Sequence, residues 1–266
     1  MKVSIITVCY NSAATIQDTF ESVLCQTYSD IDYVVVDGNS NDETVNIIKE
    51  YEKKFNGKMH WISESDKGLY DAMNKGIKMA NGDIIGILNS DDYYASNNVL
   101  TSIIEEMTKK NIDSCYGNLL YIKKNKSYRY WRSGIKKSFK LGWMPPHPCF
   151  FVKKSIYEKY GCYRLDCGFT ADYELMLRFL EKQQITTSWI NEVFVKMRIG
   201  GVSNKNISSR IEAYKDDKAA WIVNNLKPYF FTILLKKIIK ISQFFNISSI
   251  NRITGQDGAY QSKFLQ

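Results

Sequence analysis

The chain has 266 residues, of which 44% are hydrophobic and 24% are charged, and these values exclude a globally disordered chain. The length suits one large domain, or one domain with an appendage. The six cysteines form no C-x-x-C pair and there are only two histidines, which argues against a zinc site. The formal net charge is +8, and it is unevenly distributed along the chain.

The first hundred residues alternate between strand-like and helix-like segments. Strands are predicted at residues 3–9, 31–36, 60–63 and 83–88, and helices at residues 14–25, 43–55 and 69–80. This alternation predicts βα units and a mainly parallel sheet. Because a strand-like run begins at Val3, we expect no signal peptide, reduced thiols and a cytosolic location.

Polar and acidic residues follow each of these four strands, at 10–11, 37–38, 64–66 and 89–92. Ligands of parallel sheets bind outside the carboxyl ends of the strands, so these groups should share one edge. Several carboxylates at one edge repel each other, and a divalent cation bound to phosphates would relieve the repulsion. The simpler alternative for Asn89-Ser90-Asp91-Asp92 is that it only forms a turn.

The second half of the chain is less regular. Strands are predicted at residues 114–122, 127–131, 149–152 and 186–190, and helices at residues 171–183 and 207–225. Three of the four prolines fall in Met144-Pro145-Pro146-His147-Pro148, which predicts a rigid loop. Residues 123–140 hold eight lysines and arginines and no acid, so this segment is either a solvated hairpin or a surface for a polyanion. Its interleaved aromatic residues would also suit stacking on nucleic-acid bases.

Residues 227–246 have the pattern of an amphipathic helix. On a helical wheel Lys236, Lys237 and Lys240 fall within one third of the circle, and the apolar residues cover the opposite side. Three central lysines argue against a membrane-spanning helix. The pattern favours a helix that lies in a membrane interface, and the alternatives are packing on the domain or a dimer contact.

Four motifs in order resemble the family 2 glycosyltransferases, especially bacterial enzymes of O-antigen, capsule and exopolysaccharide assembly. They are SIITVCYN, VVVDGNSNDET, ESDKGLYDAMNKGI and GDIIGILNSDD, and the likeness extends from residue 3 to about residue 203. The resemblance implies a GT-A fold, a nucleotide-sugar donor, a divalent metal and inversion at the anomeric carbon. The spacing of the acidic residues by itself indicates only an edge for a metal and phosphates.

The resemblance also implies roles for residues at the strand ends. Asp91 matches the metal-binding acid of the family's D-x-D signature, Asp92 is a second candidate ligand, and the first position of the signature is Asn89 here. An asparagine suits a ribose contact better than tight metal chelation. The implied donor-binding residues are Thr7, Tyr10, Asn11, Asp37, Asp66, Lys67, Asn89 and Asp91, with Tyr10 against uracil and Asp37 accepting a bond from the base.

The stretch GFTADYELMLRF resembles the family segment in which an aspartate starts a helix near the acceptor. Asp172 is therefore the predicted general base, with helix capping as its alternative role and Glu174 as its nearest rival. His147 is expected to contact the acceptor or a phosphate. Arg198 and Ser203 belong to a late R-x-G-G-x-S loop that would hold a pyrophosphate.

The combined prediction is an inverting glycosyltransferase that moves a hexose or N-acetylhexosamine from a UDP-sugar, with Mn²⁺ or Mg²⁺, to a glycan on a polyprenyl pyrophosphate. We expect a GT-A domain at residues 1–226 and a basic tail at 227–266 on the cytoplasmic face of a bacterial inner membrane. Residues 1–100 would bind the donor and residues 101–226 the acceptor. No nucleic-acid partner is expected, and an oligomer is open. The alternatives are a metal-dependent nucleotidyl- or phosphotransferase and a non-catalytic protein that binds a polyanion or membrane.

Overall fold

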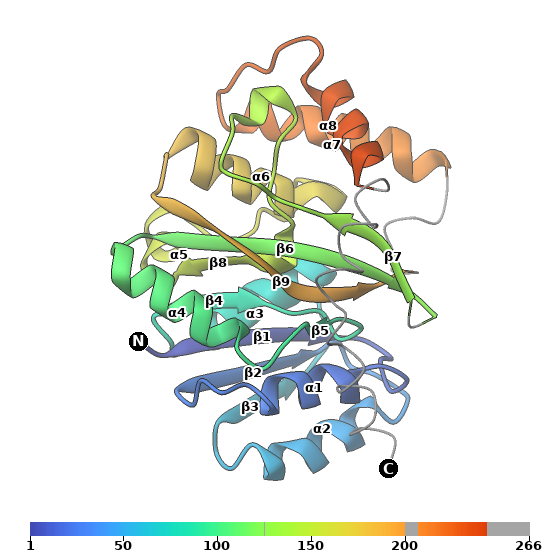
Figure 1. Ribbon diagram of the computed structural model, residues 1–266. Coiled ribbons are helices and arrows are strands. Elements are labelled where there is room, and N and C mark those ends of the chain that lie inside the picture. Colours follow the sequence, from blue (N-terminus) through green and yellow to red (C-terminus); the bar gives the residue numbers. More distant parts are fainter. Residues whose placement is uncertain (125, 200–206, 244–266) are drawn as a thin grey trace.

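A computed structural model describes residues 1–124, 126–199 and 207–243 of the chain (Figure 1). The side chains of residues 169, 207–214 and 242 are not part of this description. Ser203 and residues 244–266 of the predicted tail therefore lie outside the described residues.

A nine-stranded sheet forms the centre of the protein, in the order β3-β2-β1-β4-β8-β6-β9-β5, with β7 paired to β6. The strands are β1 (Val3–Cys9), β2 (Ile31–Asp37), β3 (Met59–Ser63), β4 (Ile84–Ile87), β5 (Tyr93–Tyr94), β6 (Ser114–Lys123), β7 (Lys126–Trp131), β8 (Phe150–Lys153) and β9 (Thr187–Arg198). The strands β1 to β4 are parallel, as the alternating pattern predicts. The sheet becomes mixed where β8 pairs antiparallel with both β4 and β6.

Helices cover both faces of the sheet (Figure 1). On one face α1 (Ile16–Leu24), α2 (Thr44–Lys54) and α4 (Val99–Lys110) share an apolar core that includes Phe20 and Tyr33. On the other face α3 (Leu69–Met79), α5 (Lys154–Tyr160), α6 (Ala171–Leu177) and α7 (Ile207–Val223) share a second core around Trp143 and Trp221. The final helix is α8 (Thr232–Ser242), and short 3₁₀ turns lie at Phe139–Leu141, His147–Cys149 and Gly168–Thr170.

Strand register places the functional loops at one edge of the sheet. Cys9 is level with Asp37 and Asp37 is level with Ser63, so the loops after β1, β2 and β3 open side by side. The strands β4, β6 and β9 run in the same direction, which brings Arg198 at the end of β9 to this edge. His147 also lies there, because β8 runs the opposite way and begins just after it. The predicted convergence of the strand ends is confirmed.

The structure differs from the sequence prediction in two long elements. The strand predicted at 186–190 continues to Arg198, where β9 pairs with β6 along its length and with β5 at Tyr93. The helix predicted at 171–183 is α-helical to Leu177 and continues as a π-helical turn at Arg178–Lys182. Both differences involve tertiary contacts. The strand β9 is extended by its pairing with β6 and β5. At the start of the π-helical turn, the side chain of Arg178 donates to three backbone carbonyls of residues 160–162.

The described part of the tail packs on the rest of the protein. Thr232 Oγ1 donates to the carbonyl oxygen of Lys140 at 2.7 Å, and the carbonyl of Gln243 accepts from the backbone N–H of Tyr130 at 3.1 Å. The buried Lys236 ammonium pairs with Asp217 on α7 at 2.6 Å. Of the predicted alternatives for this helix, packing on the domain is thus observed. In the part of the chain that is described, no helix has the length and apolarity that crossing a membrane requires.

Candidate active site

Asp37 organises the loops after β2 and β3. Its Oδ2 accepts from the backbone N–H of Ser40 at 3.0 Å and from the hydroxyl of Ser63 at 2.6 Å, and its Oδ1 accepts from the Ser40 hydroxyl. The side chain of Asp37 is fully buried. These bonds leave the carboxylate facing its own loops, so a contact with a base, as predicted, would require Ser40 to move.

Tyr10 and Asn11 stand at the end of β1, and the ring of Tyr10 is 63% exposed. Asn11 adopts a positive φ of 49°, accepts from the N–H of Asn41 through Oδ1 and donates its N–H to Ser40 Oγ. The loops after β1 and β2 are therefore bonded to each other. An exposed aromatic ring on this rigid base is suited to stack on a planar ligand group.

Asp66 lies close to Gly38, with which it lines the space beside Tyr10. A Cβ atom at Gly38 would lie 2.8 Å from Asp66 Oδ2 and 3.5 Å from the Tyr10 ring, so a larger residue there would displace the Asp66 carboxylate. Lys67 is exposed, and its backbone N–H donates to Asp71 at 3.0 Å. The predicted donor residues Tyr10, Asp66 and Lys67 thus occupy one part of the edge.

Thr7 occupies a different environment from the one predicted. Its side chain is fully buried in the middle of the sheet and shares a hydrogen bond of 2.9 Å with the hydroxyl of Tyr33. The position is inside the strand and below the loops, so Thr7 supports the core beneath the site. The resemblance assigned it to the base pocket because the motif contains it, and burial separates it from that pocket.

The loop after β4 brings Asn89, Asp91 and Asp92 together. Asp92 is fully buried, and its carboxylate accepts from Asn89 Nδ2 at 3.3 Å and from the backbone N–H of Arg198 at 3.2 Å. Burial raises the pKa of Asp91, and burial together with the Asp91 charge raises the pKa of Asp92 well above its usual value. These two adjacent carboxylates therefore lack enough compensating positive charge.

Arg198 contributes one cation to this loop. Its guanidinium donates to the carbonyl oxygen of Asp91 at 2.9 Å and pairs with Asp18 on α1. It also lies over the ring of Tyr93, with its central carbon 5.0 Å from the ring centre. The sequence predicts that Arg198 binds a pyrophosphate. In the structure Arg198 lies beside Asp91 and Asp92.

The composition of this loop fits a divalent cation shared with a ligand. Asn89 Oδ1 is buried and has no hydrogen-bond donor among the described residues. No cluster of three or more His, Cys, Asp or Glu side chains suited to a metal occurs in residues 1–124, 126–199 and 207–243. Mg²⁺ and related cations often bind through one or two carboxylates and complete their shell with phosphate oxygens and water. Asp91 and Asp92, with Asn89 beside them, match that mode.

A second group of polar residues surrounds Asp172 at the start of α6. Its Oδ1 accepts from the hydroxyl of Tyr70 at 3.2 Å and from the backbone N–H of Tyr173 at 2.8 Å. Tyr70 belongs to the first turn of α3, which follows the loop after β3, so Asp172 lies at the same edge as the donor-side loops. No hydrogen bond to Oδ2 is found among the described residues, and the side chain is partly exposed. The arrangement leaves one carboxylate oxygen able to accept a proton.

His147 joins the Asp172 group through Tyr163. The His147 Nε2 and the Tyr163 hydroxyl are 2.6 Å apart, and the Tyr163 ring packs against Tyr70 with a centre-to-centre distance of 5.5 Å. Burial lowers the pKa of His147, although the nearby Asp172 carboxylate partly opposes this shift. His147 is therefore neutral at pH 7 and can act as a hydrogen-bonding residue beside Asp172.

Glu174, the rival of Asp172 in the sequence, has a structural environment. It is 1% exposed, and its oxygens accept two hydrogen bonds of 3.0 Å from Arg178 and one of 3.0 Å from Asn224, just after α7. Arg178 in turn donates to the backbone carbonyls of residues 160–162, just before Tyr163. Glu174 is thus committed to holding α6, α7 and this loop together.

Sequence reasoning missed several residues that shape the two groups. Tyr70 lies within the quoted ESDKGLYDAMNKGI motif, and its place on the first helical turn was the available signal. Ser40 likewise lies within the quoted VVVDGNSNDET motif, three residues after Asp37. Ser63 and Tyr163 carry no such signal, because their roles arise from contacts between distant segments.

Comparison with known proteins identifies the family of the chain. The sequence profile of glycosyl transferase family 2 matches residues 4–170. The chain belongs to family 2 of the glycosyltransferases. A relative described as an uncharacterized glycosyltransferase of Mycobacterium tuberculosis H37Rv is 33% identical over 180 residues, which cover 66% of this chain and 68% of the relative. A PGL/p-HBAD biosynthesis glycosyltransferase of Mycobacterium bovis is 26% identical over 203 residues, covering 76% and 78% of the two chains.

Solved structures of low sequence identity share the fold. Staphylococcus aureus TarS 1–349, in complex with UDP-GlcNAc, has a TM-score of 0.67 at 17% identity, and the match covers 92% of this chain and 72% of that one. The mannosyltransferase PcManGT from Pyrobaculum calidifontis, in complex with GDP-Man and Mn²⁺, has a TM-score of 0.59 at 12% identity over 99% and 81% of the chains. The predicted GT-A fold, with its curled mixed sheet and flanking helices, is confirmed.

Proposed function

We propose that this family 2 glycosyltransferase transfers a hexose or N-acetylhexosamine from a UDP-sugar to a glycan acceptor, with inversion at the anomeric carbon. One observation carries the proposal: the Asp91 loop and the Asp172 carboxylate lie at the same edge of the sheet, and Asp172 Oδ2 has no bond among the described residues. An inverting displacement needs a group that holds the leaving diphosphate and one base for the acceptor hydroxyl.

The donor would bind across the loops after β1 to β4. Tyr10 would stack on the base, with Asp66 and Lys67 beside it. Asn89 would contact the ribose. Asp91 would hold Mn²⁺ or Mg²⁺, with Asp92 as a second ligand. When bound, this cation supplies positive charge to the departing diphosphate. Arg198, which pairs with Asp18 in this structure, would supply a second positive charge if the diphosphate replaced Asp18 as its partner.

Asp172 would take the proton from the attacking hydroxyl. Tyr70 and the Tyr173 N–H hold its Oδ1 in place, so Oδ2 is directed by two bonds instead of rotating freely. Burial raises the pKa of Tyr70, with Asp172 as the second cause, and the phenol remains a hydrogen-bond donor. His147 would orient the acceptor as a neutral group. In this division of labour residues 1–100 bind the donor and residues 101–226 form the acceptor side.

The acceptor is proposed to be a saccharide on a polyprenyl pyrophosphate, presented at the cytoplasmic face of a bacterial inner membrane during surface polysaccharide assembly. The support is the outer side of the tail. Phe230, Leu234, Ile238 and Ile241 are 49–99% exposed, and Lys237 beside them is exposed as well. An apolar stripe flanked by lysines suits the surface of an anionic membrane.

A panel of UDP-sugars tests the proposal. The protein should hydrolyse one UDP-sugar, or be stabilised by it in a thermal-shift assay, only when Mn²⁺ or Mg²⁺ is present. Transfer of label from the nucleotide of the UDP-sugar, instead of from its sugar, would indicate a nucleotidyl- or phosphotransferase. For the membrane contact, Leu234→Ser with Ile238→Ser should abolish sedimentation with anionic vesicles and leave UDP-sugar hydrolysis intact. Unchanged sedimentation would refute the contact.

A further inference from the structure

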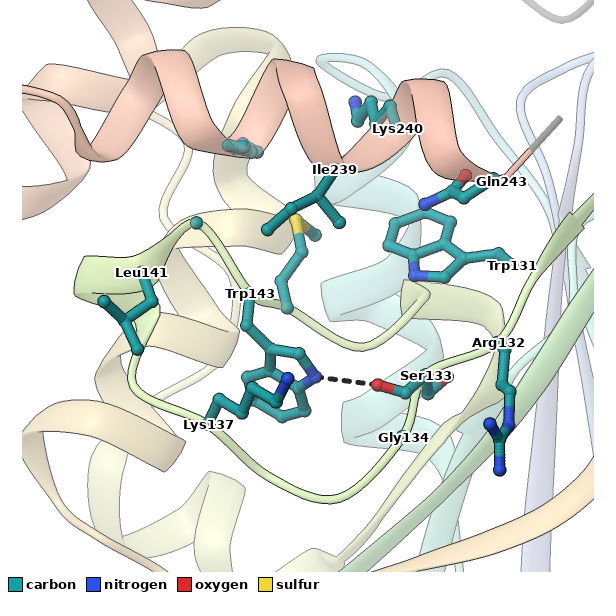
Figure 2. Close-up of a pocket in the computed structure, with 13 residues that line it drawn as sticks. Trp131, Arg132, Ser133, Gly134, Lys137, Leu141, Trp143, Ile239, Lys240 and Gln243 are labelled. Atoms are coloured by element: carbon teal, nitrogen blue, oxygen red, sulfur yellow. Dashed lines mark hydrogen bonds between the residues drawn. The ribbon is translucent and has the colours of Figure 1, made fainter. Parts of the chain in front are cut away.

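A pocket of about 440 Å³ lies between α8 and the segment that follows β7 (Figure 2). Its α8 side consists of Lys236, Ile239, Lys240 and Gln243, and its other side consists of residues from 131 to 144. The hydrogen bonds from Tyr130 to Gln243 and from Thr232 to Lys140 hold these two sides together at both ends of the helix. The volume falls within the usual range for small-ligand sites.

The pocket is strongly cationic. Arg132, Lys137, Lys236 and Lys240 line it, and no acidic residue does. Lys236 is neutralised by Asp217, whereas no ion pair to the other three is found among the described residues. Burial of its ammonium group, followed by repulsion from Lys236, lowers the pKa of Lys240 to about 8, although part of its side chain is exposed. An anion in the pocket would relieve this crowding of positive charge.

Apolar groups complete the lining. Trp143 and Met144 are buried in the second core. Ile239 points from α8 toward Trp143 (Figure 2). Trp143 is fixed by a hydrogen bond of 2.8 Å from its indole N–H to the carbonyl of Ser133. The exposed stripe of Leu234, Ile238 and Ile241 continues on the outer side of the same helix. A ligand with an anionic group attached to a hydrocarbon chain would match both surfaces.

The pocket adjoins the Asp172 group through two connections. Lys236 lies over the ring of Tyr173, with its ammonium 3.5 Å from the ring centre, and Tyr173 follows Asp172 in the chain. Met144 lines the pocket and is three residues from His147, a separation of at most roughly 11 Å in extended chain. One acceptor molecule can therefore place an anionic group in the pocket and a hydroxyl at Asp172, provided that few sugars separate them.

We propose that this pocket binds the diphosphate group of the acceptor, so that α8 is one wall of the acceptor site as well as a membrane contact. The inference rests on the proposed transfer to a lipid-linked saccharide. Lys137 and Lys240 supply point charges from the two walls of the pocket (Figure 2). The Arg132 guanidinium lies over the Trp189 ring at 5.0 Å, and a rotamer change would let it meet two phosphate oxygens. The apolar stripe of α8 then leads the prenyl chain from the pocket to the membrane.

Calorimetric titration of the full chain with farnesyl diphosphate and with inorganic pyrophosphate tests the pocket directly. EDTA is included, so that the metal-dependent donor site does not contribute. Adjacent lysines provide matched controls: Lys137 lines the pocket and Lys136 does not, and Lys240 lines it and Lys237 does not. Lys137→Ala and Lys240→Ala should each weaken binding about tenfold, the loss of one charge-assisted contact, and the two controls should change it less than twofold.

The outcomes separate the pocket from the proposed function. No binding by the wild-type protein, or equal losses in pocket and control variants, would overturn the inference. Tighter binding of farnesyl diphosphate than of pyrophosphate supports a lipid-linked acceptor, and equal binding overturns the lipid part by assigning the site to a soluble anion. Metal-dependent UDP-sugar hydrolysis should be unchanged in the Lys136→Ala and Lys237→Ala controls, which lie outside the pocket lining. Its absence from the wild-type protein contradicts the proposed function and leaves the binding result standing.

Discussion

The structure predicts that substitutions of the two acids of α6 affect different properties. Changing Glu174 should lower stability, and changing Asp172 should lower the rate of transfer. Glu174→Gln removes the charge opposite Arg178, whose side chain is 11% exposed and has no other carboxylate partner among the described residues. Breaking a buried pair by removing one partner costs about 3–5 kcal/mol. For a chain of this size that loss lowers the melting temperature by roughly 6–20 °C.

Asp172→Asn is the matched change, one amide for one carboxylate on the same helix. Asp172 is partly exposed and in the first helical turn, so its charge contributes only about 0.3–1 kcal/mol through the helix dipole. Thermal unfolding followed by circular dichroism, with transfer assayed below both transitions, compares the two variants. A Glu174→Gln protein that melts like the wild type but no longer transfers sugar would refute the reasoning, since Glu174 would then be the base.

Four further substitutions test particular contacts. Asp91→Ala should abolish the binding of UDP-sugar that depends on Mn²⁺, whereas Asn89→Asp should strengthen it; unchanged calorimetric binding in Asp91→Ala rules out the metal role. Burial raises the pKa of Asp32, but bonds from Asn81, Ser4 and His60 outweigh it and lower the pKa below 3.8. Asp32→Asn should therefore lose stability at pH 7, and its deficit in urea unfolding should disappear as the pH falls below 3.8; a deficit independent of pH contradicts this. Gly142 has a φ of 75°, and a Cβ there would lie 2.7 Å from the Leu235 carbonyl carbon, so Gly142→Ala should detach α8 and expose residues 226–243 to protease. Wild-type protease resistance would exclude that contact.

The parallel half of the sheet and its acidic edge were predictable, because both follow from local patterns. Strand and helix periods alternate up to Ile87, and parallel connection forces the strand ends onto one edge. The position of Asp91 and Asp92 at this edge can therefore be predicted without knowledge of the remaining fold. What the local pattern does not contain is the approach of Arg198, which arrives through pairing of β9 with β6.

Burial was the property that the sequence predicted least well. Thr7 and Asp37 both belong to motifs of the donor side, yet both side chains are buried. Each makes its hydrogen bonds to another strand or loop of the protein. In the same way Asp172 and Glu174 are two residues apart, and they are distinguished by their neighbours Tyr70 on α3 and Asn224 just after α7. A motif specifies which residue types are present, and the tertiary contacts specify which of them face the ligand.

The tail shows the same limit on a single helix. The wheel correctly separates the lysines from the apolar residues of α8 but does not say which side faces the protein. The buried carboxylate of Asp217 on α7 decides it, because it draws Lys236 inward and leaves Leu234 and Ile238 outside. The side expected to face polar surroundings thus forms part of a pocket.

The central claim is that Asp172 is the base and lies outside the donor site. The most direct measurement compares Asp172→Asn with the wild type in two assays, calorimetric binding of the UDP-sugar with Mn²⁺ and the single-turnover rate of transfer. We expect unchanged donor affinity and a rate at least about 10²-fold lower in Asp172→Asn. A wild-type transfer rate, or a loss of donor affinity that matches the loss of rate, would contradict it.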